Sequence, residues 1–311
     1  MTGKIIGTGS YLPPQVWDNK KIEELVETSD EWIRERTGIA QRHISQELPT
    51  SGMAIEAAKK AVADAVEKGH LNGPEEIDAI FLCSVTADIV VPCVACEIQK
   101  AIGAVNAFCY DVNAACSGFV FAYNMAVSYM NMGVLKKALI IGAEQLSGIV
   151  DWSDRGSSIL FGDGAGAVLI EANEGRNGMC MHSDGAGGDA LECSAGGKLS
   201  MDGQKVFRFA VKRVPEVITE LMTQMDIADE QVDYYILHQA NLRIVESVVK
   251  RLGIDKSKVP VNIDRMGNTS SASIPILLDE LCKEGEIKPG MHMIMAGFGA
   301  GLTWGAGYIT T

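Results

Sequence analysis

One of the eight cysteines stands in a sequence context that suits a nucleophile. Cys116 lies in the segment Asn113–Phe119, directly after an apolar stretch at 108–112 and before a helical pattern. Its small neighbours permit a sharp strand-to-helix bend. A helix N-terminus lowers the pKa of a thiol and offers backbone N–H groups to an oxyanion. The same segment equally suits a small thiol buried beneath a helix, so it leaves both interpretations open.

Two polar residues in the second half of the chain are candidates to act with Cys116. His238 follows the apolar stretch 234–237, at the carboxyl end of an expected strand, where ligand sites collect in α/β sheets. Asn268 belongs to the small, polar segment Gly267–Pro275, which opens a helix. A structural histidine and a helix N-cap remain the alternatives for these two residues.

Glycine-rich segments add one further candidate. Gly297–Gly301 follows an expected strand, so its backbone N–H groups could bind an oxyanion, although a tight turn would look the same. Gly162–Gly166 precedes an apolar strand, which is the wrong order for a dinucleotide-binding loop. Gly7 and Gly9 follow a strand, but Leu12 stands where a third glycine is required. We therefore expect no nicotinamide or flavin cofactor.

These residues must be positioned by an alternation of short apolar strands and amphipathic helices, which favours an α/β fold. Strands are expected at 77–85, 107–112, 138–143, 165–170, 232–237 and 291–296. Helices are expected at 53–68, 117–132, 207–225 and 242–252.

A weak internal repeat organises the chain into two similar halves. Both halves read strand, strand–turn–helix, strand: Asp78–Leu82, Asp111–Gly118 and Ala138–Ala143 in the first, and Asp233–Leu237, Asn262–Ser270 and His292–Gly297 in the second. We infer an N-terminal half, residues 1–172, that carries the nucleophile. A C-terminal half, residues 173–311, carries the histidine and the asparagine. Pseudo-symmetry would bring Asn268 near Cys116.

Composition excludes several classes of function. The chain has 311 residues, 47% of them hydrophobic, and a net charge of −13, so a general affinity for nucleic acid is not expected. No apolar stretch approaches the roughly 20 residues that span a membrane. Prolines and glycines near the N-terminus do not fit a signal peptide. We expect a cytoplasmic protein with reduced thiols, and no metal site, because Cys93 and Cys96 form a C-x-x-C without a second pair.

Taken together, the motifs resemble β-ketoacyl-acyl-carrier-protein synthase III, the initiating condensing enzyme of type II fatty acid synthesis. The resemblance covers essentially the whole chain. It rests on Lys4–Pro13, Thr28–Ile33, Arg36–Ile39, Asp154–Gly156, Phe161–Ala167, His238–Arg243 and Gly267–Ser270, in this order. It implies a thiolase-like fold, in which duplicated α/β halves form a five-layer αβαβα sandwich, and a homodimer. It also implies a catalytic triad of Cys116, His238 and Asn268.

The implied reaction joins a short acyl-CoA to malonyl-acyl-carrier protein and yields 3-oxoacyl-acyl-carrier protein, CoA and carbon dioxide. Cys116 would hold the acyl group as a thioester. Thiolases form their carbanion with a second cysteine in the C-terminal glycine-rich turn, which this chain lacks. Decarboxylation needs only donors to an enolate oxygen, a role for His238 and Asn268. The Cys116 and Ala300 region would bind the oxyanion, and Phe298 would shield the malonyl carboxylate. CoA is a substrate, and no cofactor is implied.

The resemblance also places the binding surfaces. Trp32 and Arg155 would sandwich the adenine of CoA, and Arg36 would lie near its phosphates. The remaining expected CoA contacts are Gly203, Phe207, Ala240 and Asn241. Basic residues on two helices could attract the acidic acyl carrier protein, although such residues usually form only a solvated face: Arg208, Lys212, Arg243, Lys250 and Arg251.

Val91 stands where many family members place a larger residue against the acyl pocket, so primers larger than acetyl, including branched ones, are expected to fit.

Three rival interpretations remain: a related condensing enzyme of a secondary-metabolite pathway, a non-catalytic partner of the same fold, and a purely structural α/β protein. The cysteine, histidine and asparagine together argue against the last two.

Overall fold

The computed structural model describes all 311 residues, and its main sheet consists of two parts, a first sheet and a second sheet, that join along their edges. In the first half the strand order is β1-β7-β6-β4-β5, and β6, β4 and β5 run parallel. These strands are β1 (Thr2–Tyr11), β4 (Ala79–Cys83), β5 (Phe108–Val112), β6 (Lys137–Glu144) and β7 (Gly164–Asn173). One residue pair, Lys4 with Thr310, joins β1 to the second half, which gives one continuous nine-stranded sheet.

The second half repeats this order as β8-β13-β12-β11. Its strands are β8 (Met179–Ser183), β11 (Tyr234–Leu237), β12 (His292–Gly299) and β13 (Thr303–Thr310). As in the first half, the last strand in sequence lies between two other strands of its half and is antiparallel to both. A strand equivalent to β5 is absent, because residues 259–262 are irregular. The shared topology is the expected duplication.

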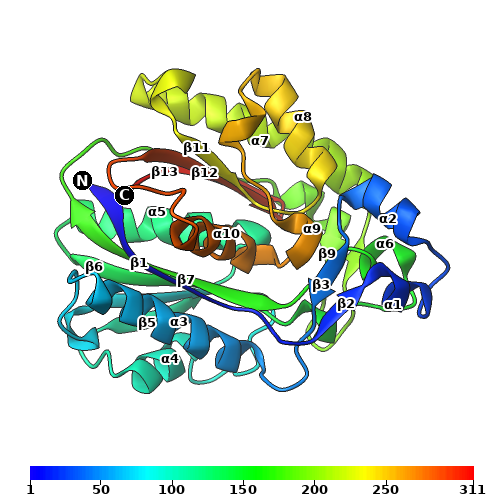
Figure 1. Cartoon of the computed structure of the whole chain (residues 1–311), viewed down its shortest axis with the longest axis horizontal. Coiled ribbons are helices and arrows are strands. Elements are labelled where there is room, and N and C mark those ends of the chain that lie inside the picture. Colours follow the sequence, from blue (N-terminus) through cyan, green and yellow to red (C-terminus); the bar gives the residue numbers. More distant parts are fainter.

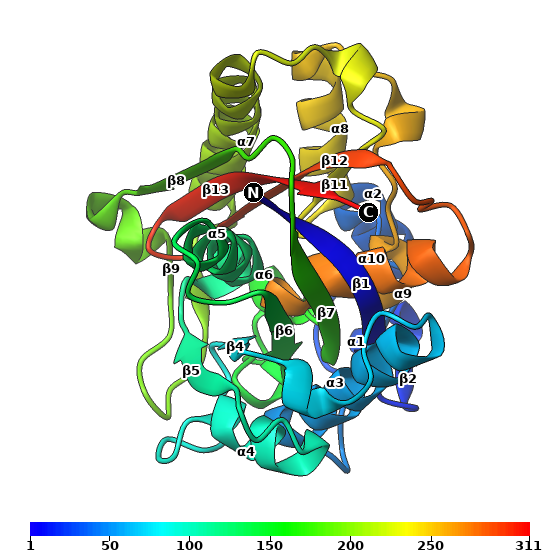
Figure 2. The same cartoon turned by 90° about the vertical axis from the view of Figure 1, so that its left-hand side faces the viewer.

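Two helices pack between the sheets. α5 (Gly118–Asn131) and α10 (Ser273–Lys283) contribute to one buried cluster with residues of both sheets, such as Ile140 and Met293. α5 is apolar on nearly every side, as a helix covered on both faces must be. Figure 2 shows both helices enclosed between the strands of the two halves.

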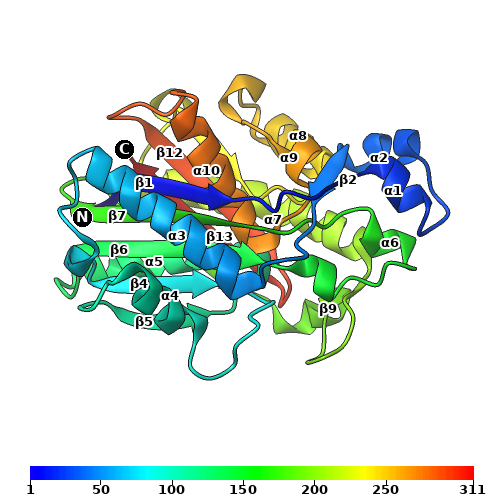
Figure 3. The same ribbon diagram turned by 60° about the horizontal axis from the view of Figure 1, so that its bottom comes forward.

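The outer faces of the sheets are covered by further helices. α3 (Thr50–Glu67) and α4 (Val94–Ile102) bury the far side of the first sheet, and α3 lies across β1 and β7 (Figure 3). α7 (Gly203–Met225) and α8 (Leu242–Leu252) bury the far side of the second sheet (Figure 1). The layers therefore alternate helix, sheet, helix, sheet, helix. None of these helices is long and apolar enough to cross a membrane.

The segment between β1 and α3 lies at the end of the molecule opposite the two termini (Figure 1). It contains β2 (Val16–Asp18), α1 (Asn19–Glu23), α2 (Asp30–Thr37) and β3 (Gln41–His43), beside α6 (Arg155–Ser158) and α9 (Ile263–Met266). The fully buried Arg42 joins these parts by donating to Asn19 Oδ1 at 2.9 Å and to the Ile159 carbonyl at 2.8 Å. Burial lowers the pKa of Arg42 to about 10.

The six predicted strands and four predicted helices are confirmed, with differences only at their ends. β13 was not among the predicted strands. Its Gly305 and Gly307 suggest a turn, but they are glycines because the strand passes close to its neighbours. A Cβ at Gly305 would lie 2.8 Å from the Cys180 carbonyl oxygen, and one at Gly307 would collide with the Asn124 side chain. Such close backbone approaches are a common reason for glycine inside a strand.

Candidate active site

Cys116 lies at the turn that connects β5 to α5. The turn is a short 3-10 helix, Ala115–Ser117, and Ala115 has a left-handed φ of +47°. A non-glycine residue in this conformation stores about 1–2 kcal/mol of strain, a feature that clusters at functional sites. Ser117 stabilises the turn, since its Oγ lies 2.7 Å from the Ala114 carbonyl and 2.9 Å from Thr303 Oγ1. The result is a bend that carries Cys116 at the start of a buried helix.

A second turn of the same kind leads into α10. It is the 3-10 helix Ser270–Ala272, and Ser270 has a φ of +52° that matches Ala115. Asn268 precedes the turn, and its Oδ1 accepts the Ser270 backbone N–H at 2.9 Å. Its Nδ2 makes no hydrogen bond within the protein and remains available as a donor. The side chain therefore stabilises the turn and lines the central cavity as well. It is not a helix N-cap, because Thr269 and Ala272 occupy the N-cap positions of the 3-10 helix and of α10.

His238 directly follows β11, and its ring is held by α10. Its backbone N–H donates to the Ala296 carbonyl, and Nδ1 lies 2.7 Å from Ser273 Oγ. His238 Nδ1 is the only acceptor that the hydrogen bonds of Ser273 offer to its hydroxyl proton, since Oγ accepts in its other bond, from the Gln239 N–H. We therefore assign the serine proton to Nδ1 and the ring proton to Nε2. Burial lowers the pKa of His238 to about 3, so the ring is neutral at physiological pH.

The pKa of the Cys116 thiol is raised in the structure, whereas the sequence context had predicted that a helix N-terminus would lower it. The thiol is buried, and this burial raises its pKa to about 12, with a smaller contribution from the charge of Glu144. A bond from Ser270 opposes the shift without reversing it. Burial thus outweighs the influence of the helix N-terminus that was expected to lower the pKa. In the unliganded protein Cys116 is a thiol, and it would have to lose its proton to act as a nucleophile.

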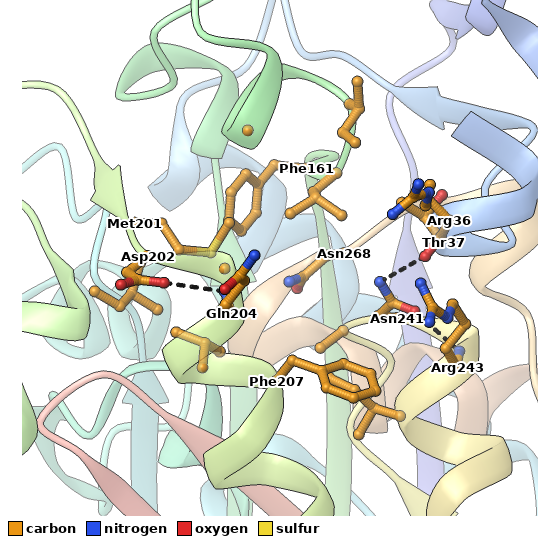
Figure 4. Close-up of a pocket in the computed structure, with 18 of the residues that line it drawn as sticks. Arg36, Thr37, Phe161, Met201, Asp202, Gln204, Phe207, Asn241, Arg243 and Asn268 are labelled. Atoms are coloured by element: carbon orange, nitrogen blue, oxygen red, sulfur yellow. Dashed lines mark hydrogen bonds between the residues drawn. The ribbon is translucent and has the colours of Figure 1, made fainter. Parts of the chain in front are cut away.

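The three side chains line one cavity of about 950 Å³. The cavity runs between α2, α6, α7 and α8, and Figure 4 shows Asn268 at its centre with Phe207, Asn241 and Arg243 on one wall. Beside Cys116, His238 and Asn268, it is lined by further predicted residues: Trp32, Arg36, Arg155, Gly203, Phe207, Arg208, Ala240, Asn241, Arg243 and Phe298.

The outer part of the cavity is cationic and aromatic. The Arg155 guanidinium lies 4.8 Å from the ring centre of Trp32, and that of Arg36 lies 5.5 Å from it. Asn241 Nδ2 donates to the Arg36 carbonyl at 3.1 Å, which ties α2 to the start of α8. A planar, electron-rich ring with phosphates attached would find both stacking and charge here.

Five predicted residues lie outside the cavity lining. Ala300 is in the turn after β12, where its neighbours Gly299 and Leu302 line the cavity instead. Val91 lies on a loop before α4 and is 86% exposed. Lys212, Lys250 and Arg251 are on the outer helices α7 and α8 but do not reach the cavity.

Sequence reasoning missed the apolar wall of the cavity. It consists of Ile159, Leu160, Phe161, Leu191, Met201 and Leu302. These residues come from four separate segments of irregular structure or short strands, so no periodic pattern marks them. Phe161 could have been suspected, since it begins the motif Phe161–Ala167 and pairs with Asn268 through a parallel β-bridge.

Comparison with known proteins identifies what this arrangement is similar to. Residues 110–196 match the family model for 3-oxoacyl-[acyl-carrier-protein] synthase III, and residues 222–311 match the model for its C-terminal part. The chain is 44% identical over 320 residues to β-ketoacyl-[acyl-carrier-protein] synthase III of Clostridium acetobutylicum, with 97% of each chain covered.

Solved structures agree with this. The 3-oxoacyl-[acyl-carrier-protein] synthase III of Aquifex aeolicus superposes with a TM-score of 0.94 at 43% identity, covering 98% of this chain and 99% of that one. The priming β-ketosynthase of the R1128 polyketide pathway superposes with a TM-score of 0.92 at 32% identity, covering 99% and 96%. The predicted thiolase-like fold is confirmed.

The buried neutral state of His238 predicts a specific pH dependence of stability. Its pKa is about 3 in the folded protein and about 6.5 in an unfolded chain, so the unfolded state binds the proton first as pH falls. Stability contributed by His238 is therefore present above about pH 6.5 and lost as pH falls towards 3. In urea denaturation, the free energy of unfolding should fall more steeply below that pH than in His238→Gln, by up to about 1.4 kcal/mol per pH unit. His70→Gln, at an exposed position, should keep the wild-type slope, and an identical slope in His238→Gln would contradict the prediction.

Proposed function

Because this chain belongs to the 3-oxoacyl-[acyl-carrier-protein] synthase III family, we propose that it condenses a short-chain acyl-CoA with malonyl-acyl-carrier protein. The products are 3-oxoacyl-acyl-carrier protein, CoA and carbon dioxide, and the reaction initiates fatty acid synthesis. The observation that carries the proposal is the shared cavity, which receives a cysteine, a neutral histidine and an asparagine amide from different elements of the fold.

In the first half-reaction Cys116 is acylated. Its sulfur attacks the thioester carbonyl, CoA leaves as the thiol, and the proton of Cys116 passes to the CoA sulfur. The backbone N–H groups of Cys116 and of the Ala300 region would stabilise the tetrahedral oxyanion. Gly299 permits this arrangement, because a Cβ there would lie only 2.6 Å from the Cys116 nitrogen.

In the second half-reaction malonyl-acyl-carrier protein loses carbon dioxide. The electron pair of the broken bond forms an enolate, whose oxygen would accept hydrogen bonds from His238 Nε2 and Asn268 Nδ2. The enolate carbon attacks the acyl-enzyme carbonyl, Cys116 leaves as a thiolate, and the thiolate takes up one proton from solvent. The ring centre of Phe298 lies 5.3 Å from that of His238, so an apolar surface faces the carboxylate, and poor solvation favours its loss as neutral carbon dioxide.

We assign the CoA contacts by the same geometry. Trp32 and Arg155 would hold the adenine, and Arg36 would meet its phosphates, as the cationic and aromatic cavity mouth suggests. The pantetheine arm would pass between α7 and α8, where the cavity is lined by Gly203, Phe207, Ala240 and Asn241.

The exposed edge of the first sheet supports a homodimer. β5 is the outermost strand and has no neighbour on its free side. Large apolar side chains lie around it, with Val90 at 89% exposure, Val91 at 86% and Val105 at 74%. An uncovered strand edge of this kind is a common dimer interface. Pairing of two such edges would carry Val91 towards the partner's acyl pocket, where its small size would admit primers larger than acetyl.

All eight cysteines are free, which fits the cytoplasm as the site of action.

The activity can be tested by incubating the protein with malonyl-acyl-carrier protein and equimolar acetyl-, propionyl-, butyryl- and isobutyryl-CoA. Mass spectrometry should detect a 3-oxoacyl-acyl-carrier protein in the wild type and in Cys193→Ala, which removes an exposed cysteine that does not line the cavity. Cys116→Ala should form none, because it has no nucleophile. The product ratio names the preferred primer. An acyl adduct on Cys116 without condensation would contradict the proposal and favour another acceptor, as in a polyketide pathway.

Carrier-protein docking predicts a charge-reversal effect at the cavity mouth. Arg243 lies over the ring of Phe207, with 5.6 Å between the guanidinium carbon and the ring centre. Arg243→Glu should raise the KM for malonyl-acyl-carrier protein at least about fivefold at low salt, and added salt should shrink the difference. Lys100→Glu, on α4 across the molecule, makes the same charge change and should leave this KM unchanged. An unchanged KM in Arg243→Glu would dismiss the docking role.

A further inference from the structure

Glu144 is a fully buried carboxylate that the proposed reaction does not use. It is the last residue of β6, has no exposed surface, and takes part in no salt bridge. Four groups donate hydrogen bonds to its side chain instead: Ser84 Oγ, the Val85 N–H, Thr86 Oγ1 and Ser270 Oγ. Ser271 Oγ shares its one proton between Glu144 and the Cys83 carbonyl, each 2.8 Å away. Burying a carboxylate is costly unless it is hydrogen-bonded. This number of donors therefore indicates that the fold maintains the position of Glu144.

The donors divide into two groups on opposite sides of the carboxylate. Oε2 accepts from the loop after β4, with Thr86 Oγ1 at 2.7 Å and the Val85 N–H at 3.1 Å. Oε1 accepts from the turn before α10, with Ser271 Oγ at 2.8 Å and Ser270 Oγ at 3.0 Å. The carboxylate therefore fastens the turn of the second half to the sheet of the first half.

The turn that Glu144 fastens is the one that orients Asn268. The Ser270 hydroxyl binds Glu144, and the Ser270 backbone N–H binds Asn268 Oδ1 at 2.9 Å. That second bond fixes which end of the amide faces the cavity, because it occupies the oxygen and leaves Nδ2 free. Ser270 also holds a left-handed φ of +52°, a conformation that needs support from its surroundings.

We propose that Glu144 is a positioning residue for the enolate-stabilising part of the site: through Ser270 it holds the Asn268 amide in the orientation that decarboxylation requires. This inference rests on the proposed function. Glu144 touches neither substrate. Its effect should therefore fall mainly on the step that uses Asn268. Acylation of Cys116 should change little, because loss of the Glu144 charge and loss of the bond from Ser270 shift the pKa of Cys116 in opposite directions.

Glutamine is the sharpest substitution, because it keeps the shape of the side chain. The Val85 N–H is a backbone donor that cannot reverse, so the amide oxygen would take the place of Oε2. The amide NH₂ would then face Ser270 and Ser271, where an acceptor stood, and the Ser270 hydroxyl would have to turn away. Thr86→Val is the matched control, since it removes a donor on the loop side and leaves the contact with Ser270 intact.

The two half-reactions should be measured separately. Acylation is followed by mass spectrometry of Cys116 after rapid mixing with acetyl-CoA. Decarboxylation is followed as release of labelled carbon dioxide when malonyl-acyl-carrier protein is added to the purified acetyl-enzyme. In Glu144→Gln, carbon dioxide release should slow by roughly 10- to 100-fold, because small misplacements of a catalytic group have effects of this size. Acylation in this variant should be no more than about threefold slower, and Thr86→Val should stay within about threefold of wild type in both steps.

The outcomes are distinguishable. Selective loss of decarboxylation in Glu144→Gln supports the positioning role. Equal loss of both half-reactions would mean that Glu144 is merely structural, and no loss in either would mean that Asn268 is held without it; both overturn the proposal. If the wild type itself releases no carbon dioxide from malonyl-acyl-carrier protein, the proposed function fails, whatever the variant does.

Discussion

The active site forms where two equivalent turns, one from each half of the chain, approach each other closely. One turn carries Cys116 into α5 and the other follows Asn268 into α10, and both helices lie between the sheets. Gly142 in the centre of β6 has no room for a side chain, since a Cβ there would collide with the Ser271 carbonyl. Gly299 likewise abuts the backbone of Cys116. Duplication of one α/β unit supplies the two turns, and glycines let them meet.

Burial then sets the chemistry that this meeting place can perform. The cavity's inner end is dry enough to raise the pKa of Cys116 to about 12 and to lower that of His238 to about 3. A neutral imidazole is a poor base for removing a carbon-bound proton, but it is a good hydrogen-bond donor. The site therefore suits a reaction in which loss of carbon dioxide creates the carbanion and the protein only stabilises the charge that develops.

Much of this could be predicted from the sequence, because its signals are local. The apolar stretches marked six strands, and the weak repeat indicated the duplication. The motifs around Cys116, His238 and Asn268 named three residues that line one cavity. What escaped prediction depends on tertiary environment. Glu144 ends an apolar strand and looks like a solvent-exposed residue, whereas its donors come from segments about 60 and 126 residues away. The raised pKa of Cys116 follows from burial, which a sequence motif does not report.

The central claim is that His238 and Asn268 act together on one enolate oxygen, and a double-mutant cycle tests it most directly. Release of carbon dioxide from malonyl-acyl-carrier protein would be measured for wild type, His238→Ala, Asn268→Ala and the double variant, each with Cys116 already acylated. If the two donors form a unit, each single change should cost roughly 100-fold, and the double change should cost little more than either. Fully additive losses, or a single variant that keeps the wild-type rate, would contradict the account.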